Sequence, residues 1–124
     1  MTEFQETDLP LLAPSPTNPR KTFADLEGLA ESIKAQGVMQ PILIRPWPDD
    51  YPTPEGRDSR PLYEIVAGER RYRASLLAGL ATIPALVRPL TTRQVLEAQI
   101  VENLQRRDVT ELEEAEGYQL MMRD

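Results

Sequence analysis

The sequence predicts one α+β domain, a small mixed sheet with packed helices, followed by a helical extension at its C-terminal end. Two patterns predict this class. Segments whose apolar residues recur every three or four positions, as in amphipathic helices, alternate with short runs of β-branched and other apolar residues that are typical of strands. A chain of 124 residues with 40% hydrophobic content has room for one modest core and not for two.

The amino-acid composition excludes several kinds of chemistry. The chain has no cysteine and no histidine, which excludes disulfides, thiolate or imidazole metal sites and histidine bases. Carboxylates, arginines, amides and backbone groups remain, and this set favours phosphate chemistry. The net charge of -6 argues against general DNA binding by this segment. No apolar run reaches the roughly 20 residues that span a bilayer, and the acidic start does not resemble a signal peptide, so we expect a cytoplasmic protein without membrane contact.

The first part of the chain is predicted to contain an arm, a helix and a strand. Residues 1–18 are expected to form an irregular arm because they are mostly acidic, polar and proline residues with only a short apolar patch, and the main domain is expected to span 19–107. Thr22 is predicted to cap a helix, with Asp25 completing a capping box. The apolar stripe of this helix comprises Phe23, Leu26, Leu29, Ala30 and Ile33. The helix is predicted to end at Gly37, and a buried strand is predicted at Ile42–Arg45.

A proline-rich segment divides this part from the next. Residues 46–61 contain five prolines and are predicted to form a surface loop. A second strand at 62–67, a helix ending near Gly79 and a third strand at Ile83–Arg88 follow. This spacing allows a right-handed crossover between parallel strands.

Two further helices are predicted at the end of the chain. Thr92 is expected to cap the first, whose inward stripe comprises Val95, Leu96, Gln99, Ile100 and Leu104. Residues 108–124 are expected to begin a truncated helical region, in which Thr110 and Glu113 form a second capping box. The apolar residues 120–122 lack a predicted packing partner, so we expect the natural chain to continue.

The segment Gly68, Glu69, Arg70, Arg71 lies where a strand is predicted to end and a helix to begin. Free N–H groups and the positive end of the helix dipole attract anions at such a junction, and guanidinium groups suit phosphate oxygens. The alternative is an exposed i,i+4 pair of Glu69 and Arg73 beside two solubilising arginines. The local pattern favours neither interpretation.

A second group of candidate residues lies at the end of the helix that begins near Thr92. Glu102 and Asn103 could supply oxygen ligands to Mg²⁺, with Arg106 reaching a phosphate. An ordinary i,i+4 pair of Glu102 and Arg106 explains the local pattern better. Gln40, Arg45 and the turn Asn18 to Arg20 are weaker candidates.

Five segments in order add a family resemblance. They are NPR (18–20), GVMQPILIR (37–45), YEIVAGERRYRA (63–74), AGLATIPALV (78–87) and ENLQRRDVTELEEAEGY (102–118). In this order they resemble the N-terminal domain of the ParB family of chromosome and plasmid partition proteins, which shares its fold with sulfiredoxin and binds CTP with magnesium. The resemblance implies that the triphosphate is cradled by Gly68, Glu69, Arg70 and Arg71, that Glu102 and Asn103 hold magnesium, that Arg106 and Arg20 lie near the phosphates, and that the Gly37 to Arg45 segment, including Gln40, lines the base pocket.

The resemblance also implies a function. In ParB proteins, CTP and a DNA site drive the N-terminal domains of a dimer to engage and close a clamp on DNA, and slow hydrolysis reopens it. Glu102 is the residue assigned to this hydrolysis, as a magnesium ligand. A helix-turn-helix after residue 118 would read the DNA. ParB proteins also engage a ParA-type ATPase through basic residues in the arm, and because this arm has none before Arg20, we do not expect ParA contact through it.

Other functions remain open on the same sequence. A ParB-like nuclease or an ADP-dependent serine kinase could use the same phosphate site, and a dimerisation module could retain the fold without nucleotide binding. Sulfiredoxin activity is excluded because it requires a catalytic cysteine.

Overall fold

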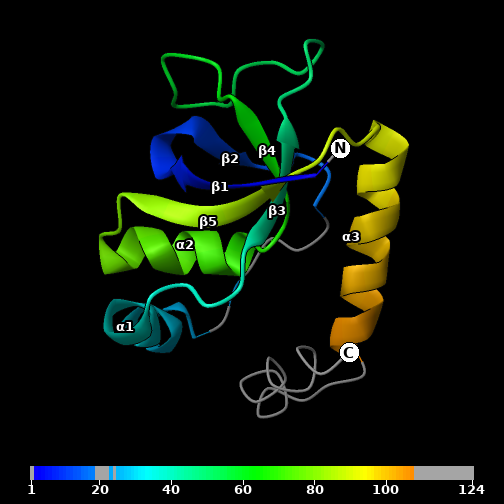
Figure 1. Cartoon of the computed structure of the whole chain (residues 1–124). Coiled ribbons are helices and arrows are strands. Elements are labelled where there is room, and N and C mark those ends of the chain that lie inside the picture. The colour runs from blue at the N-terminus through cyan, green and yellow to red at the C-terminus, as the bar shows by residue number, and fades with distance from the viewer. Residues whose placement is uncertain (1, 19–22, 24, 108–124) are drawn as a thin grey trace.

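The computed structural model describes residues 2–18, 23 and 25–107, with the side chains of 103–107 left undescribed. In chain order the elements are β1 (Glu3–Asp8), a 3-10 turn (Leu9–Leu11), β2 (Leu12–Pro14), α1 (Leu26–Gln36), β3 (Ile42–Pro46), β4 (Tyr63–Ala67), α2 (Glu69–Ala78), β5 (Thr82–Val87) and α3 (Thr92–Arg107). The predicted α+β class is confirmed (Figure 1). None of the helices built from these residues is long and apolar enough to cross a membrane.

The strands form one mixed sheet in the order β1-β5-β3-β4-β2. β3 is parallel to β5 and antiparallel to β4, while β1 pairs antiparallel with β5 and β2 pairs parallel with β4. Helix α2 lies against the sheet, α1 packs on the far side of α2, and α3 runs beside them (Figure 1). β4 and β5 are therefore antiparallel with β3 between them, and the predicted parallel crossover is wrong.

The first residues of the chain belong to the sheet. The prediction of an irregular arm at 1–18 is wrong, since β1 and β2 form the two edges of the sheet. A strand at an edge needs only backbone pairing, and β1 exposes Glu3, Phe4, Glu6 and Asp8 to solvent while burying Thr7. This pattern lacks the apolar alternation by which strands are recognised from sequence.

The connection between these two edge strands shows that the sheet curls. From Asp8 to Leu12 the chain advances four residues, which span at most about 14 Å. Four strand spacings across a flat sheet would measure about 19 Å. The 3-10 turn crosses one end of the sheet, where Leu9 N donates to Ala81 O at 3.0 Å and Leu62 N donates to Leu11 O at 2.9 Å.

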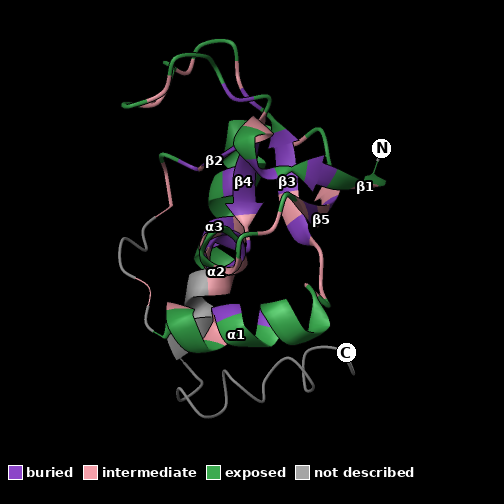
Figure 2. Cartoon of the chain, turned by 90° about the vertical axis from the view of Figure 1, so that its left-hand side faces the viewer, coloured by how far each residue is buried: buried purple, intermediate pink, exposed green. Residues whose placement is uncertain are grey.

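The core draws on every strand except β1. Its main cluster comprises Leu9, Leu12, Ile42, Ile44, Ile65, Tyr72, Ile83 and Ala85. A second cluster of Ala30, Ile33 and Ala74 joins α1 to α2. Figure 2 shows this buried material concentrated on the central strands and between the helices.

Two helix starts differ from their predicted positions. Helix α1 begins at Leu26, after Asp25 in a left-handed conformation with φ 54°, so Asp25 precedes the helix, and Thr22 lies outside the described residues. Helix α3 is capped by Thr91 instead of Thr92, because Thr91 Oγ1 accepts from Gln94 N at 3.1 Å and Gln94 Oε1 accepts from Thr91 N at 2.9 Å. The predicted helix after Thr110 also lies outside the described residues.

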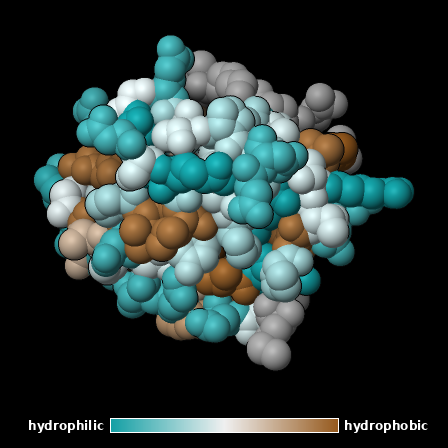
Figure 3. All heavy atoms as spheres, turned by 90° about the horizontal axis from the view of Figure 1, so that it is seen from above, coloured by the Kyte–Doolittle hydropathy of each residue, from teal (hydrophilic) through white to brown (hydrophobic). Residues whose placement is uncertain are grey.

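The predicted loop at 46–61 is confirmed, but it is anchored to the sheet. Arg57 Nη1 donates to Leu12 O in β2 at 2.7 Å, while Arg60 Nη2 donates to Pro48 O at 2.6 Å within the loop. On the face that carries this loop, hydrophilic residues separate small hydrophobic patches (Figure 3). Arg57 is thus a structural residue and not a freely solvated cation.

Candidate functional site

The junction between β4 and α2 provides an open helix N-terminus. Gly68 precedes the helix with φ 101°, and it has no side chain with which to cap the first turn. A Cβ at this position would lie 2.6 Å from Ile42 Cγ2 and 3.2 Å from Arg71 Nη2, so only glycine fits. The N–H groups that follow Gly68 are suited to bind an anion.

Arg71 connects this junction with the segment before β3. Its Nη1 donates to Gln40 O at 2.7 Å and to Pro41 O at 3.0 Å. The predicted phosphate segment and the predicted base segment, which are about 30 residues apart in sequence, therefore meet at this guanidinium. Arg70 lies on the outer side, with Nη2 3.4 Å from Asp25 O.

Glu69 is buried and joins the end of the N-terminal segment to α2. Its carboxylate accepts from Asn18 Nδ2 at 2.9 Å and from Arg73 Nε at 2.7 Å, and Arg73 stacks over the Phe23 ring at 4.9 Å. The i,i+4 pair considered from sequence is present, but only 6% of the Glu69 side chain is exposed. Glu69 thus holds residue 18, two positions before Arg20, against the start of α2.

Helix α3 brings Glu102 to the same place. Burial raises the pKa of Glu102, while the positive charge of Arg71 lowers it and the negative charge of Glu69 raises it further. The two charged groups that act on Glu102 both belong to the start of α2, so Glu102 lies within electrostatic range of that helix end. The Asn103 and Arg106 side chains, and Arg20, lie outside the described residues.

The side-chain oxygen of Gln40 has no hydrogen-bond donor among the described residues. This atom, Oε1, is buried. An unpaired buried acceptor costs about 1 to 3 kcal/mol, so the position favours a ligand that offers an N–H group. Gly37 is the C-cap of α1 with φ 77°, as predicted for the helix end, and a Cβ there would meet nothing within 4 Å.

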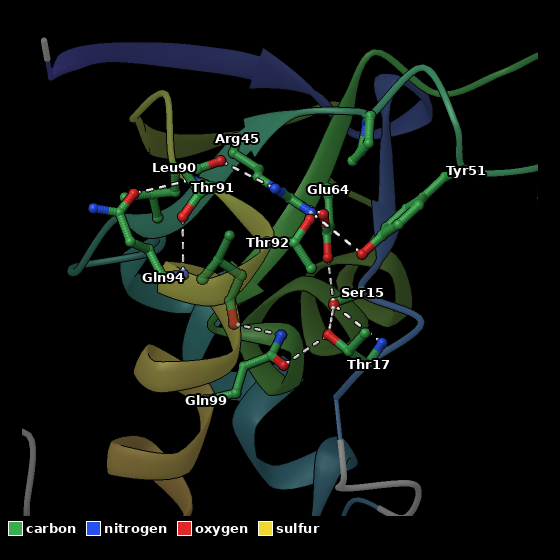
Figure 4. A network of polar contacts seen from close by, with 12 residues as sticks. Ser15, Thr17, Arg45, Tyr51, Glu64, Leu90, Thr91, Thr92, Gln94 and Gln99 are labelled. Atoms are coloured by element: carbon green, nitrogen blue, oxygen red, sulfur yellow. Dashed lines mark hydrogen bonds and ion pairs between the residues drawn. The ribbon is translucent and has the colours of Figure 1, made fainter.

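Arg45 has a structural role that the sequence did not reveal. It is 4% exposed, and its Nε bonds Glu64 Oε1 at 2.6 Å within the sheet (Figure 4). Its other nitrogens donate to Leu90 O, the Tyr51 hydroxyl and Thr92 Oγ1. The guanidinium is thus committed to the interior, and the nucleotide site proposed below does not include it.

Gln99 is a polar residue of this region whose role sequence reasoning missed. The sequence places it in the apolar stripe of α3, and the structure buries it to 4% exposure. Its Oε1 accepts from Thr17 Oγ1 at 2.9 Å, and its Nε2 donates to Val66 O at 3.4 Å. An amide at an inward helical position was the available signal, because a buried amide requires partners.

The comparison with protein families decides the family. The family described as ParB N-terminal domain matches residues 1–104. The chain belongs to this family. The match begins at residue 1, in agreement with the two edge strands contributed by the start of the chain.

Relatives of this ParB N-terminal domain are partition proteins. It is 49% identical over 118 residues to the chromosome-partitioning protein Spo0J of Thermus thermophilus, covering 92% of this chain and 39% of that protein. It is 47% identical over 120 residues to ParB of Caulobacter vibrioides, covering 95% of this chain and 36% of that protein. The chain thus spans little more than a third of the length of these relatives.

Solved structures agree with the family and the fold. C-terminally truncated ParB from Caulobacter crescentus, complexed with CTP-gamma-S, matches 97% of this chain and 63% of that chain with a TM-score of 0.70 and 45% identity. The same protein complexed to the centromeric parS site matches 95% of this chain and 56% of that chain with a TM-score of 0.66 and 43% identity. Sulfiredoxin from Arabidopsis thaliana matches 77% of this chain and 96% of that chain with a TM-score of 0.55 at 21% identity, which supports the fold alone. The predicted ParB/sulfiredoxin-like fold is confirmed.

Proposed function

We propose that this ParB N-terminal domain binds CTP with Mg²⁺ at the junction of β4, α2 and α3 and acts as a nucleotide-dependent switch. The observation that carries the proposal is the uncapped Gly68 helix N-terminus with the Arg71 guanidinium beside it, and Glu102 lies within electrostatic range of both Arg71 and Glu69. A complex of a 45% identical relative with CTP-gamma-S supports the choice of nucleotide. In this proposal the backbone from Gly68 to Arg71 holds the triphosphate, and Arg20 and Arg106 approach it.

The base specificity is proposed to depend on Gln40. Its buried, unpaired Oε1 can accept a hydrogen bond from an exocyclic amine. Cytosine carries such an amine at N4, whereas uracil carries a carbonyl oxygen there. Gly37 would shape the backbone beside this pocket. Gln40 would therefore favour CTP over UTP.

Magnesium fits the oxygen donors that are present. The described residues hold no cluster of three or more acidic, histidine or cysteine side chains that could form a complete metal cage. Mg²⁺ commonly takes one or two protein oxygens and completes its shell with water and substrate phosphates, which suits Glu102 with Asn103. Bound Mg²⁺ would neutralise charge on the phosphate oxygens. Glu102 is the residue we assign to slow CTP hydrolysis, as the protein ligand of this ion.

The experiment that tests the binding proposal is calorimetric titration with CTP, ATP, GTP and UTP, each with magnesium and with a chelator. Selective, magnesium-dependent CTP binding is expected. Tighter binding of ATP than of CTP would contradict the proposal. Metal-dependent cleavage of plasmid DNA that Glu102→Ala abolishes would instead indicate a nuclease.

Two variant pairs make the test residue-specific. Arg71→Ala should weaken CTP binding by about 1.5 to 3 kcal/mol, the value of a charge-assisted hydrogen bond, while Arg93→Ala, with a side chain 88% exposed, should have little effect. Gln40→Leu should reduce the preference for CTP over UTP, and the exposed Gln36→Leu should preserve it. Unfolding midpoints of all four variants control for loss of structure.

For the whole protein, we propose that CTP promotes engagement of two N-terminal domains on DNA during partition of a chromosome or plasmid. A helix-turn-helix beyond these residues would read the DNA site. A relative bound to its centromeric parS site supports the DNA partner. Contact with a ParA-type ATPase is not assigned to the first residues, because residues 1–19 contain no lysine or arginine. Cross-linking of the chain through an engineered cysteine, with and without CTP, would test engagement.

A further inference from the structure

One continuous chain of hydrogen bonds leaves α3 at Gln99 and returns to it at Thr92 (Figure 4). The Thr17 hydroxyl donates to Gln99 Oε1, the Thr17 backbone N–H donates to Ser15 Oγ at 3.3 Å, and the Ser15 hydroxyl donates to Glu64. Glu64 binds Arg45, and Arg45 donates to Thr92 Oγ1 at 3.3 Å. Helix α3 is therefore attached to the sheet at two points by one polar network that includes the segment after β2.

Polar groups, more than apolar area, hold the middle of α3 in place. Gln99 is 4% exposed, whereas its apolar neighbours Leu96, Ile100 and Val101 are 40%, 58% and 54% exposed. Val95 is the buried apolar residue one turn earlier. Hydrogen bonds are directional, so the two bonds of the Gln99 amide fix both the rotation and the axial position of the helix.

The Gln99 anchor lies next to the proposed nucleotide site. Its acceptor Val66 precedes Gly68 by two residues, at the end of β4. Glu102 follows Gln99 by three residues, so both side chains point from one face of α3. Anchoring Gln99 at the end of β4 therefore fixes the turn of α3 that carries Glu102, within electrostatic range of Arg71 and Glu69 at the start of α2.

We propose that Gln99 is a positioning residue, which holds α3 so that the Glu102 carboxylate faces Arg71 and the N-terminus of α2. This inference rests on the proposed nucleotide function. Gln99 itself binds protein groups on both ends of its amide, so it acts on the ligand only through Glu102. Loss of the anchor should therefore impair the magnesium-dependent part of CTP binding and spare the part that Gly68 and Arg71 provide.

The test compares Gln99→Leu with Glu97→Leu. Gln99→Leu replaces the amide with an apolar side chain of similar size and removes both of its hydrogen bonds. Glu97→Leu introduces leucine at an exposed position of the same helix. Calorimetry gives the ratio of the CTP dissociation constants measured with a chelator and with magnesium. Mutation of a residue that orients a metal ligand typically lowers metal affinity about 10- to 100-fold. The ratio of the dissociation constant with chelator to that with magnesium should therefore fall at least about tenfold in Gln99→Leu and stay unchanged in Glu97→Leu. Binding with the chelator should stay within about twofold.

A second background separates positioning from general damage. In Glu102→Gln protein the magnesium effect is already lost, so adding Gln99→Leu should cause no further loss. A further loss in the double variant, or an equal loss with and without magnesium, would overturn the proposal. If Gln99→Leu does not fold, Thr17→Val, which removes the donor to Gln99 Oε1, replaces it under the same criteria.

A measurement without nucleotide keeps this inference distinct from the proposed function. Amide hydrogen exchange in Gln99→Leu should accelerate in α3 and remain unchanged in α1 and β5. If the parent protein binds no CTP, the proposed function fails and exchange alone decides the inference. Acceleration confined to α3 then supports Gln99 as its anchor, and exchange identical to that of the parent refutes it.

Discussion

Replacing Gly68 with alanine tests the geometry of the site without any ligand. The residue has φ 101° and ψ 21°, a conformation that L residues rarely adopt. An alanine Cβ would also lie 2.6 Å from Ile42 Cγ2 and 2.9 Å from Ile42 Cβ, inside van der Waals contact. Both effects raise the free energy of the folded state.

The expected magnitude follows from these two terms. Left-handed backbone costs a residue with a Cβ about 1 to 2 kcal/mol. Overpacking in a core costs about 1 to 3 kcal/mol, because Ile42 is fully buried and cannot move freely. Gly68→Ala should therefore lower the free energy of unfolding by about 2 to 5 kcal/mol.

Gly79→Ala is the matched control. Gly79 has φ 78°, yet a Cβ there would meet nothing within 4 Å, so only the backbone term of about 1 to 2 kcal/mol applies. Urea unfolding followed by circular dichroism measures both variants, and equal m-values would show that the denatured states are comparable. If Gly68→Ala costs no more than Gly79→Ala, the close approach of β3 to the start of α2 is refuted.

Three further changes have defined outcomes. Glu64→Gln should lower the free energy of unfolding by about 3 to 5 kcal/mol, because it leaves the buried Arg45 charge uncompensated. Thr91→Ala should cost about 0.5 to 2 kcal/mol by removing the cap that Gln94 N requires. Glu102→Gln should stabilise the metal-free protein at neutral pH and leave it unchanged in acid. Burial raises the pKa of Glu102, so the folded state binds this proton more tightly, and the resulting stability is lost as pH rises through the raised pKa.

Chemical or thermal unfolding measures all three, and each has an outcome that contradicts it. Glu97→Gln, which breaks an exposed pair with Arg93, should change stability by no more than about 1 kcal/mol. A similarly small effect in Glu64→Gln would show that Arg45 finds another partner. Full stability of Thr91→Ala would place the start of α3 elsewhere. If the difference in stability between Glu102→Gln and the parent increases as the pH falls, the pKa of Glu102 is lowered in the folded state and the prediction is wrong.

The central elements of the fold were predictable because local sequence determines them. The strands predicted at 42–45 and 62–67 correspond to β3 (Ile42–Pro46) and β4 (Tyr63–Ala67), and the helix between Gly68 and Gly79 begins and ends at glycines, as expected. The order of strands was not predictable. Placing β3 between β4 and β5 depends on pairing between residues distant in sequence, such as Ile44 with Val87, which no local pattern encodes.

The candidate site was predictable where a motif combines backbone and charge. Arg71 binds the backbone of Gln40 and Pro41, so two segments that the family resemblance assigned to one nucleotide site lie together. The resemblance assigned Arg45 to the segment that lines the base pocket, and the local pattern suggested a solvated arginine at a strand end, whereas the sheet supplies Glu64 as a buried partner. Only the tertiary structure reveals such a pair.

The pairing of β1 has a consequence for how this protein folds as it is made. Phe4 pairs with Leu86, 82 residues further along the chain. At about 5 to 20 residues per second, the ribosome releases β1 roughly 4 to 16 s before its partner strand exists. During this interval an unpaired strand risks association with other chains. The acidic residues Glu3, Glu6 and Asp8, which hid this strand from sequence-based prediction, would oppose such association until β5 arrives.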